Sequence, residues 1–186
     1  VSLYPAIMVH FNISPETILP DPTADNIVPA LGLAIDTSQE GLIPKALRPL
    51  LEKRIEMKKH LASTPAWDPF RKIFKQRASA LKWLLVTCFG YLGYKNARFG
   101  RIEAHQAVTA YGREALLRAK EAAEDMGFKV IQLYVDGLWV QHPDKTQPED
   151  IEPLLLEIEH RTGLPISLDG IYRWVIFVGS RQNKNR

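Results

Sequence analysis

The sequence predicts an α+β fold in which an antiparallel sheet carries helices on one face. Two observations lead to this prediction. Apolar residues recur at three- and four-residue spacing over two long stretches, which indicates amphipathic helices. Farther along, one Asp-Gly pair stands between two apolar runs, which indicates a β-hairpin. The chain has 186 residues, 46% of them hydrophobic, which is enough for a sizeable core.

The first 44 residues are predicted to hold little helix. Residues 1–9 form an apolar run that we interpret as a strand broken by Pro5. Residues 11–44 are rich in proline, which excludes a long helix, and we interpret them as a connector. Within this connector, a short hairpin is expected around Ala30–Ile35.

Two helices are predicted next, as an antiparallel pair. Leu47, Leu51 and Ile55 mark the apolar face of a helix over residues 44–60. The run STPAWDP at residues 63–69 breaks this helix, and a second one is predicted over residues 70–89. Because only a short turn joins them, the two helices are expected to form a helical hairpin.

The rest of the chain is predicted to add two helices and three strands. An aromatic, glycine-punctuated loop at residues 90–100 separates these elements from the helical hairpin. Gly127 and Gly163 are placed to end the two helices. The predicted elements are a helix over 102–126, a strand over 129–135, the turn Asp136–Gly137, a strand over 138–141, a helix over 148–162 and a final strand over 171–178.

Positive charge is concentrated in the predicted helical hairpin. The formal net charge is +3, but residues 45–82 hold eleven Lys or Arg and only three acidic residues. A basic stretch of this kind favours a polyanionic partner such as nucleic acid. A solvated helical surface would have the same composition, so charge alone does not choose between the two interpretations.

The cysteine, the histidines and the apolar runs of the sequence give no sign of a disulfide, a histidine metal site or a membrane-spanning helix. Cys88 is the only cysteine, which excludes an internal disulfide and fits a buried thiol in a reducing compartment. The five histidines show no metal-ligand spacing. We find neither a signal peptide nor an apolar run of membrane-spanning length, and we expect a monomeric, cytoplasmic chain without membrane contact.

Three short motifs occur in a fixed order along the chain: SLYP at residues 2–5, KWLLVTCFG at 82–90 and YVDG at 134–137. The intervening runs PLLEKRIEMKK, GYLGYKNARFG and AVTAYGRE complete the set, which resembles DNA polymerase family B over nearly the whole chain. The resemblance implies a palm over 1–40 and 93–178, fingers over 41–92 and the start of a thumb over 179–186. In these terms, the predicted sheet is the palm sheet and the helical hairpin is the fingers.

Asp136 is the candidate catalytic and metal-binding residue. Judged by its neighbours alone, it is a hairpin turn residue beside Gly137. The resemblance implies that Asp136 binds one of two Mg²⁺ ions, and that Tyr134 replaces a further aspartate of the motif. It also implies that the other essential aspartate belongs two positions before Val1. We therefore expect the chain by itself to be inactive.

Three cations are candidates for binding a nucleoside triphosphate. Arg54 and Lys58 are four residues apart, so they share one face of the first helix of the hairpin, and Lys82 lies on the second helix. By charge alone they could equally be surface cations. The resemblance implies that all three bind the triphosphate, together with the backbone N–H groups of Ser2 and Leu3.

Further residues are candidates for contacting the sugar and the bases. The resemblance implies that Tyr4 is a sugar gate that excludes a 2′-hydroxyl, although an aromatic residue in a half-buried strand would look the same. It implies that Val86, Phe89 and Gly90 lie under the nascent base pair, where the family has asparagine and tyrosine in place of the first two. An ordinary apolar helix face would also explain them.

Four basic residues are candidates for contacting DNA, namely Arg98, Arg101, Arg181 and Lys184. The last two could equally belong to a frayed terminus.

We therefore expect the core of a DNA-directed DNA polymerase, with primer-template DNA and deoxynucleoside triphosphates as partners. Two alternatives are a degenerate polymerase that only binds DNA, motivated by Tyr134, Val86 and Phe89, and an unrelated nucleic-acid-binding helical hairpin. The second does not explain the order of the motifs.

Overall fold

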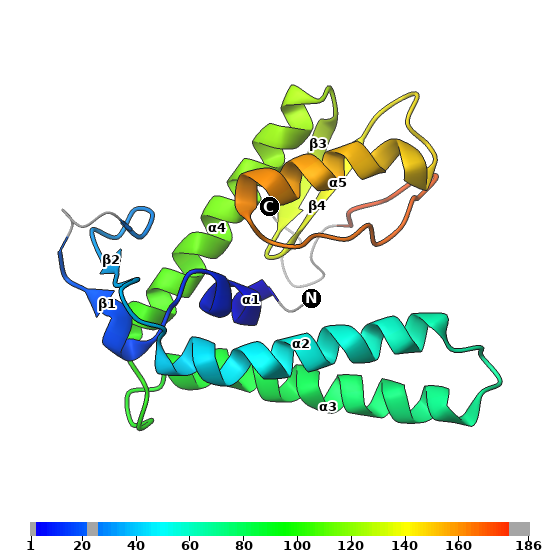
Figure 1. Ribbon diagram of the computed structural model, residues 1–186. Helices are drawn as coiled ribbons and strands as arrows, with labels where there is room; N and C mark the ends of the chain where they lie inside the picture. The colour runs from blue at the N-terminus through cyan, green and yellow to red at the C-terminus, as the bar shows by residue number, and fades with distance from the viewer. Residues whose placement is uncertain (1–2, 22–25, 179–186) are drawn as a thin grey trace.

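The computed structural model describes residues 3–21 and 26–178, which form five α-helices and two small antiparallel sheets (Figure 1). The α+β class is thus as predicted. In chain order the elements are α1 (Leu3–His10), the 3-10 helix η1 (Pro15–Thr17), β1 (Ile18–Leu19), β2 (Ala34–Ile35), α2 (Leu42–Ser63), α3 (Pro69–Leu92), α4 (Ile102–Asp125), β3 (Lys129–Tyr134), β4 (Gly137–Gln141) and α5 (Pro148–Thr162).

Helices α2 and α3 form the predicted hairpin, which projects as an arm from the rest of the molecule (Figure 1). Its far end is closed by side chains near the turn. Asp68 accepts a hydrogen bond from the backbone N–H of Phe70 and so caps α3. Arg71 donates to the carbonyl oxygens of Leu61 and Thr64 at the end of α2, where the last carbonyls of a helix lack N–H partners within the helix. Side-chain hydrogen bonds therefore stabilise the turn that joins α2 to α3.

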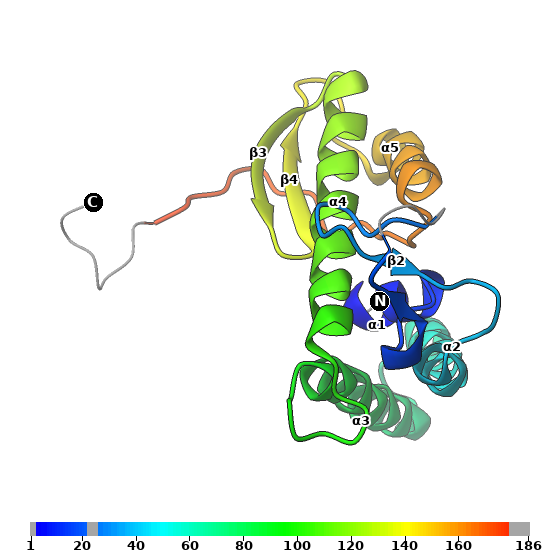
Figure 2. The same cartoon turned by 90° about the vertical axis from the view of Figure 1, so that its left-hand side faces the viewer.

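Helix α4 contributes to two separate hydrophobic clusters, one with the helices at its start and one with α5 and the β3–β4 hairpin at its end (Figure 2). Its first half packs with α1, α2 and α3 around fully buried residues such as Ile7, Leu85 and Val108. Its second half packs with α5 and the β3–β4 hairpin around Ala122 and Phe128. In Figure 2, α4 and α5 lie to the same side of that hairpin. No helix in the part of the chain that the structure describes is long and apolar enough to cross a membrane.

The first strand prediction is wrong, because Leu3–His10 is a helix. Pro5 lies in its first turn, where a missing N–H costs nothing. Ile7 and Met8 are fully buried, and α1 contacts α2, α3 and α4. A short helix that is buried all round has no polar face, so its sequence shows no helical periodicity and looks like a buried strand.

The connector contains the expected turn but uses it differently. The chain reverses between Val28 and Leu33, and Ile27 bridges to Ala34. The regular pairing, however, joins β2 to the distant β1, with Ile18 opposite Ile35. The predicted local hairpin is therefore one part of a three-segment arrangement.

The hairpin near Asp136 forms as predicted, but its turn is displaced by one residue. Tyr134 pairs with Gly137, so Val135 and Asp136 are the two loop residues, and Gly137 opens β4. Val135 has a φ of 49°, the left-handed value that such tight loops need. An irregularity between Val130 and Gln132 shifts the register by one residue. The expected Asp136–Gly137 turn is thus wrong in register.

The final strand prediction is also wrong. Residues 171–178 have no regular secondary structure, and all their side chains are exposed, with Trp174 at 75%. Within the described chain, their contacts with the β3–β4 hairpin include ring contacts of Tyr172 and Phe177 with Trp139. The apolar sequence favours a strand, but a strand also needs a neighbour, and the expected single sheet is instead divided into two separate pairs.

The base of α2 is anchored by residues that follow α1. Helix α2 begins after Gly41, which has no side chain to cap it. Instead, the side-chain oxygen of Asn12 accepts from the N–H of Gly41, and Glu16 and Ser14 accept from Leu42 and Ile43. The Asn12 amide also donates to the carbonyl oxygens of Asp36 and Gln39, both at 2.8 Å.

We predict that Asn12→Gly lowers the free energy of unfolding by about 1–3 kcal/mol. The substitution removes the hydrogen bonds of the Asn12 side chain to the N–H of Gly41 and to the carbonyl oxygens of Asp36 and Gln39. Glycine suits the left-handed backbone of Asn12, whose φ is 55°, so the change isolates the side chain. The matched control is Ala30→Gly at φ 59°, where stability should stay equal or rise. Urea unfolding measures both, and an equal effect of the two variants would contradict the anchoring role.

Candidate functional site

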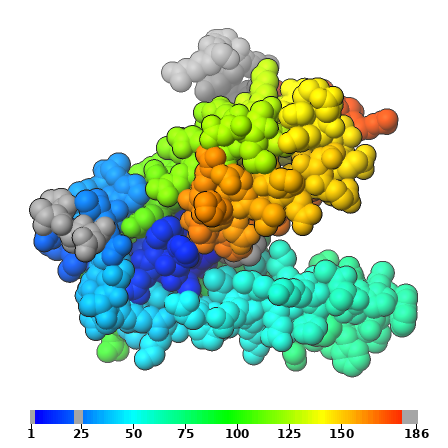
Figure 3. All heavy atoms as spheres, turned by 45° about the horizontal axis from the view of Figure 1, so that its top comes forward, coloured from blue at the N-terminus to red at the C-terminus, as the bar shows by residue number. Residues whose placement is uncertain are grey.

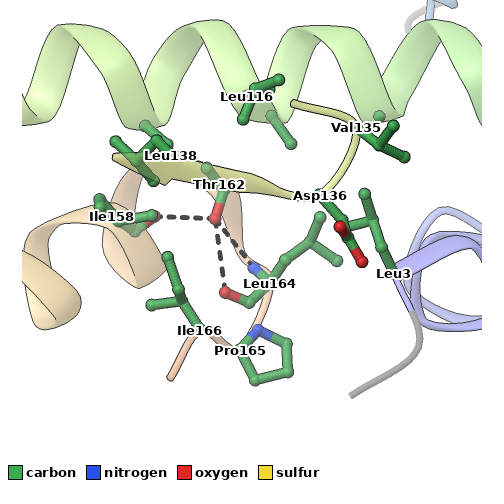
Figure 4. Close-up of a pocket in the computed structure, with 13 residues that line it drawn as sticks. Leu3, Leu116, Val135, Asp136, Leu138, Ile158, Thr162, Leu164, Pro165 and Ile166 are labelled. Carbon is green, nitrogen blue, oxygen red and sulfur yellow. Dashed lines mark hydrogen bonds between the residues drawn. The ribbon is translucent and has the colours of Figure 1, made fainter. Parts of the chain in front are cut away.

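Asp136 stands in the β3–β4 loop beside the first residue of α1. Figure 4 shows its carboxylate next to the Leu3 side chain. Both residues line two adjoining cavities. The Asp136 side chain is exposed, and it has no hydrogen-bond or ion-pair partner among the described residues. It therefore offers a free carboxylate at the point where the hairpin loop meets α1.

An apolar cavity of about 70 Å³ lies behind this carboxylate. Side chains from α4, α5 and the segment after α5 line it, including Leu116, Ile158 and Leu164 (Figure 4). The Thr162 hydroxyl donates to the carbonyl oxygen of Ile158 and accepts from the N–H of Leu164, which fixes the turn that leaves α5. The loop bearing Asp136 thus borders an apolar cavity.

Metal-binding residues are sparse around Asp136. No group of three or more His, Cys, Asp or Glu side chains placed to hold an ion occurs within residues 3–21 and 26–178. Tyr134, at the end of β3, is 67% exposed and carries no carboxylate. A carboxylate without a partner has the hard oxygen donors that Mg²⁺ prefers, but Asp136 supplies only one ligand group.

Arg54 is buried without a full set of partners. It is 8% exposed and continues the buried face of α2 that Leu47 and Leu51 form. Its Nε and Nη1 atoms have no hydrogen-bond partner among the described residues. Burial lowers the pKa of its guanidinium below the ordinary value. Because an unpaired buried cation is costly, this arrangement points to an anion as the missing partner.

The two candidate lysines differ from Arg54. Lys58 lies one turn farther along α2 and Lys82 lies on α3, and both are exposed. The two helices pack against each other, so all three cations belong to the same arm. The surface is hollowed between this arm and the part formed by α5 (Figure 3). Helix α1 connects the two sides, because it contacts α2 and α3 while Leu3 reaches Asp136.

Three aromatic rings stack at the base of the arm. The Tyr4 ring lies 4.3 Å from that of Phe89, and Phe89 lies 4.3 Å from the imidazole of His105, with interplanar angles of 29° and 19°. Burial lowers the pKa of His105. The structure brings the two predicted candidates Tyr4 and Phe89 together. His105 has no sequence signal, because stacking between side chains of different helices leaves no local pattern.

Other predicted residues have more varied surroundings. Val86 and Gly90 are exposed on α3. Arg98 is exposed and lies over the Phe99 ring. Arg101 is engaged within the chain, because its guanidinium donates to the carbonyl oxygens of Pro15 and Ile18 and lies 3.5 Å from Glu103. These contacts indicate that Arg101 holds η1 and β1 against the start of α4. Its predicted contact with DNA stays a prediction. Ser2, Arg181 and Lys184 lie outside the described residues.

Comparisons with known proteins agree on one family. The sequence model of DNA polymerase family B matches residues 1–151. DNA polymerase 2 of Saccharolobus solfataricus is 37% identical over 182 residues, which cover 98% of this chain and 25% of that protein. DNA polymerase 2 of Aeropyrum pernix is 31% identical over 186 residues, which cover 97% of this chain and 23% of that protein.

A solved structure gives the same result. The family B DNA polymerase from the hyperthermophilic archaeon Pyrobaculum calidifontis matches with a TM-score of 0.70 and 32% sequence identity. The match covers 92% of this chain and 22% of that one. The chain therefore spans about a quarter of the length of the relatives that it matches.

We predict that Arg54→Met raises the free energy of unfolding of the ligand-free chain by about 1–3 kcal/mol, because it removes buried donors that lack partners while keeping the volume. The control is Lys58→Met on the same helix, where an exposed cation is removed and the change should stay within about 0.5 kcal/mol. Urea unfolding measures both. A clear loss of stability in Arg54→Met would mean that the guanidinium already has a partner.

Proposed function

Because the chain belongs to DNA polymerase family B, we propose that it is the nucleotide-binding core of a DNA-directed DNA polymerase. In this proposal the intact protein joins deoxynucleotides to the 3′-hydroxyl of a primer on a DNA template. Residues 41–92 are the fingers, residues 1–40 and 93–178 belong to the palm, and residues 179–186 begin the thumb. The single observation that carries the proposal furthest is the buried guanidinium of Arg54, two of whose nitrogen atoms have no hydrogen-bond partner among the described residues.

The triphosphate of the incoming nucleotide is the anion that fits Arg54. The N–H bonds of Nε and Nη1 point in different directions, so oxygens on two different phosphate groups of a triphosphate would be needed to accept from both unpartnered atoms. Lys58 and Lys82 are exposed on the same arm and would neutralise the remaining phosphate charge. The backbone N–H groups of Leu3, at the start of α1, and of Ser2, which lies outside the described residues, are the further proposed phosphate contacts.

Asp136 is the proposed metal ligand on the opposite side of this site. Its carboxylate is exposed and has no hydrogen-bond or ion-pair partner in the part of the chain that the structure describes, so it is free to bind one Mg²⁺ together with phosphate oxygens. When bound, a pair of such ions stabilises the attacking and leaving oxygens of nucleotidyl transfer. The contribution of this chain is to hold Asp136 on a tight loop beside an apolar cavity and next to α1.

The remaining contacts concern the sugar, the bases and the DNA backbone. Tyr4 is proposed to exclude ribonucleotides, and Val86, Phe89 and Gly90 to support the nascent base pair. The stack of Tyr4 on Phe89 supports this grouping, because it places the two rings in one platform. Phe89 has no hydroxyl and Val86 no amide, so we expect shape rather than hydrogen bonding to select the base pair. Arg98, Arg101, Arg181 and Lys184 are the proposed DNA contacts.

A second candidate function is a polymerase-like protein that binds DNA and nucleotides without extending a primer. The observation that favours it is Tyr134, which stands near the only carboxylate of the hairpin loop and cannot replace a second one. This candidate shares the triphosphate site and differs only in the chemistry.

We predict that the intact protein extends a DNA primer in Mg²⁺, and that Asp136→Asn abolishes extension while binding of dATP persists, because asparagine keeps the shape but loses the charge that holds the ion. Arg54→Met should instead weaken dATP binding about ten- to hundredfold, since charged hydrogen bonds to phosphate are lost. Primer extension and equilibrium binding of a fluorescent dATP measure the two effects.

Each outcome of this experiment selects one function. Binding of dATP without primer extension by the wild-type protein would establish the second candidate. Full extension by Asp136→Asn would contradict the metal assignment. Unchanged dATP binding by Arg54→Met would remove the observation on which the triphosphate site rests. Lys72→Met, an exposed cation on α3, serves as the control for loss of positive charge on the arm.

A further inference from the structure

We propose that His105 is a positioning residue that sets the selectivity of the sugar gate, by holding Phe89 against Tyr4. This inference deepens the proposed function and rests on it. The observation behind it is that three rings from three different helices stack in series, with His105 at the end away from Tyr4.

The Tyr4 ring is held by packing alone. Its hydroxyl has no hydrogen-bond partner among the described residues. One neighbour of the ring is Phe89, and another is the backbone of Gly112 on α4, where a Cβ atom would lie 3.5 Å from Tyr4 Cε1. The position of the Tyr4 ring therefore follows the position of Phe89, because no directional bond fixes it independently.

Phe89 is in turn held from both faces. Its ring lies between Tyr4 and His105, with both centroid distances at 4.3 Å. If the imidazole were absent, the ring of Phe89 would lose its contact on one face and gain room to move away from Tyr4. Phe89 and His105 are both half-buried, so losing the imidazole would remove the packing contacts on one face of Phe89 and leave that face free to shift. A change at residue 105 would thus reach Tyr4 without touching it.

The imidazole itself has little freedom. A Cβ atom on Gly93 would lie 2.8 Å from His105 Cδ2, so the ring packs directly on the glycine backbone at the end of α3. Its neighbours on α4, Ala104 and Ala107, are fully buried in the core. The lowered pKa of His105 fits a neutral ring that is held by stacking. The stack therefore has a rigid end at Gly93 and an adjustable end at Tyr4.

The test compares variants of the intact protein in their choice between dATP and ATP. For each variant we measure the ratio of kcat/KM for the two nucleotides in primer extension, and the ratio of their dissociation constants in Mg²⁺. We expect His105→Ala to lower the preference for dATP about tenfold, and His105→Phe to restore it, because phenylalanine can stack in the same place. A general loss of stability would lower the use of both nucleotides and leave the ratios unchanged.

His60→Ala is the matched control. His60 also stacks on a phenylalanine, Phe74, at 5.4 Å and 20°, but it lies near the far end of the arm. Its removal should leave both ratios unchanged. If His105→Ala does not fold, His105→Leu keeps much of the volume without the planar ring and is expected to lower the ratios in the same direction.

Two results would overturn the inference, and they are distinguishable. Wild-type ratios in a folded His105→Ala or His105→Leu protein that binds both nucleotides would contradict the role of His105 and leave the proposed function intact. Absence of nucleotide binding by the wild-type protein would contradict the proposed function, and this inference would fall with it.

Discussion

A positive charge buried without a full set of partners is the constraint on which the candidate site depends. Arg54 occupies a position on α2 that would suit a leucine, since Leu47 and Leu51 precede it on the same buried face. Two of its nitrogen atoms have no partner in the described chain. A protein under selection for stability alone would gain from an apolar residue here, because such a replacement is often neutral or stabilising. The cost is understandable if an anion enters between the arm and α1.

Helix α1 lies between Asp136 and the α2–α3 arm and adjoins both. Its first residue reaches Asp136, its body packs against the arm, and the residues that follow it cap the base of α2. One short segment thus positions the candidate carboxylate relative to the candidate cations. Tyr4, on the same helix, begins the aromatic stack that ends at His105. The site is therefore assembled around α1, although neither the carboxylate nor the cations belong to it.

The long helices could be predicted because each has one buried and one exposed face, and because Gly127 and Gly163 end two of them at left-handed φ values. Helix α1 could not, since burial on all sides removes the pattern. The register of the Asp136 loop depends on an irregularity in β3, which only the pairing reveals. Candidate residues such as Arg54 were found through motif resemblance. Its burial, and the place of His105 under Phe89, depend on packing between helices and have no local signature.

A crystal structure of the chain with dATP and Mn²⁺ would show where the triphosphate binds. We expect triphosphate density within hydrogen-bond distance of Arg54 Nε and Nη1, between Lys58 and Lys82, and an anomalous manganese signal at the Asp136 carboxylate. Triphosphate bound elsewhere, with the Arg54 guanidinium still unpaired, would contradict this expectation.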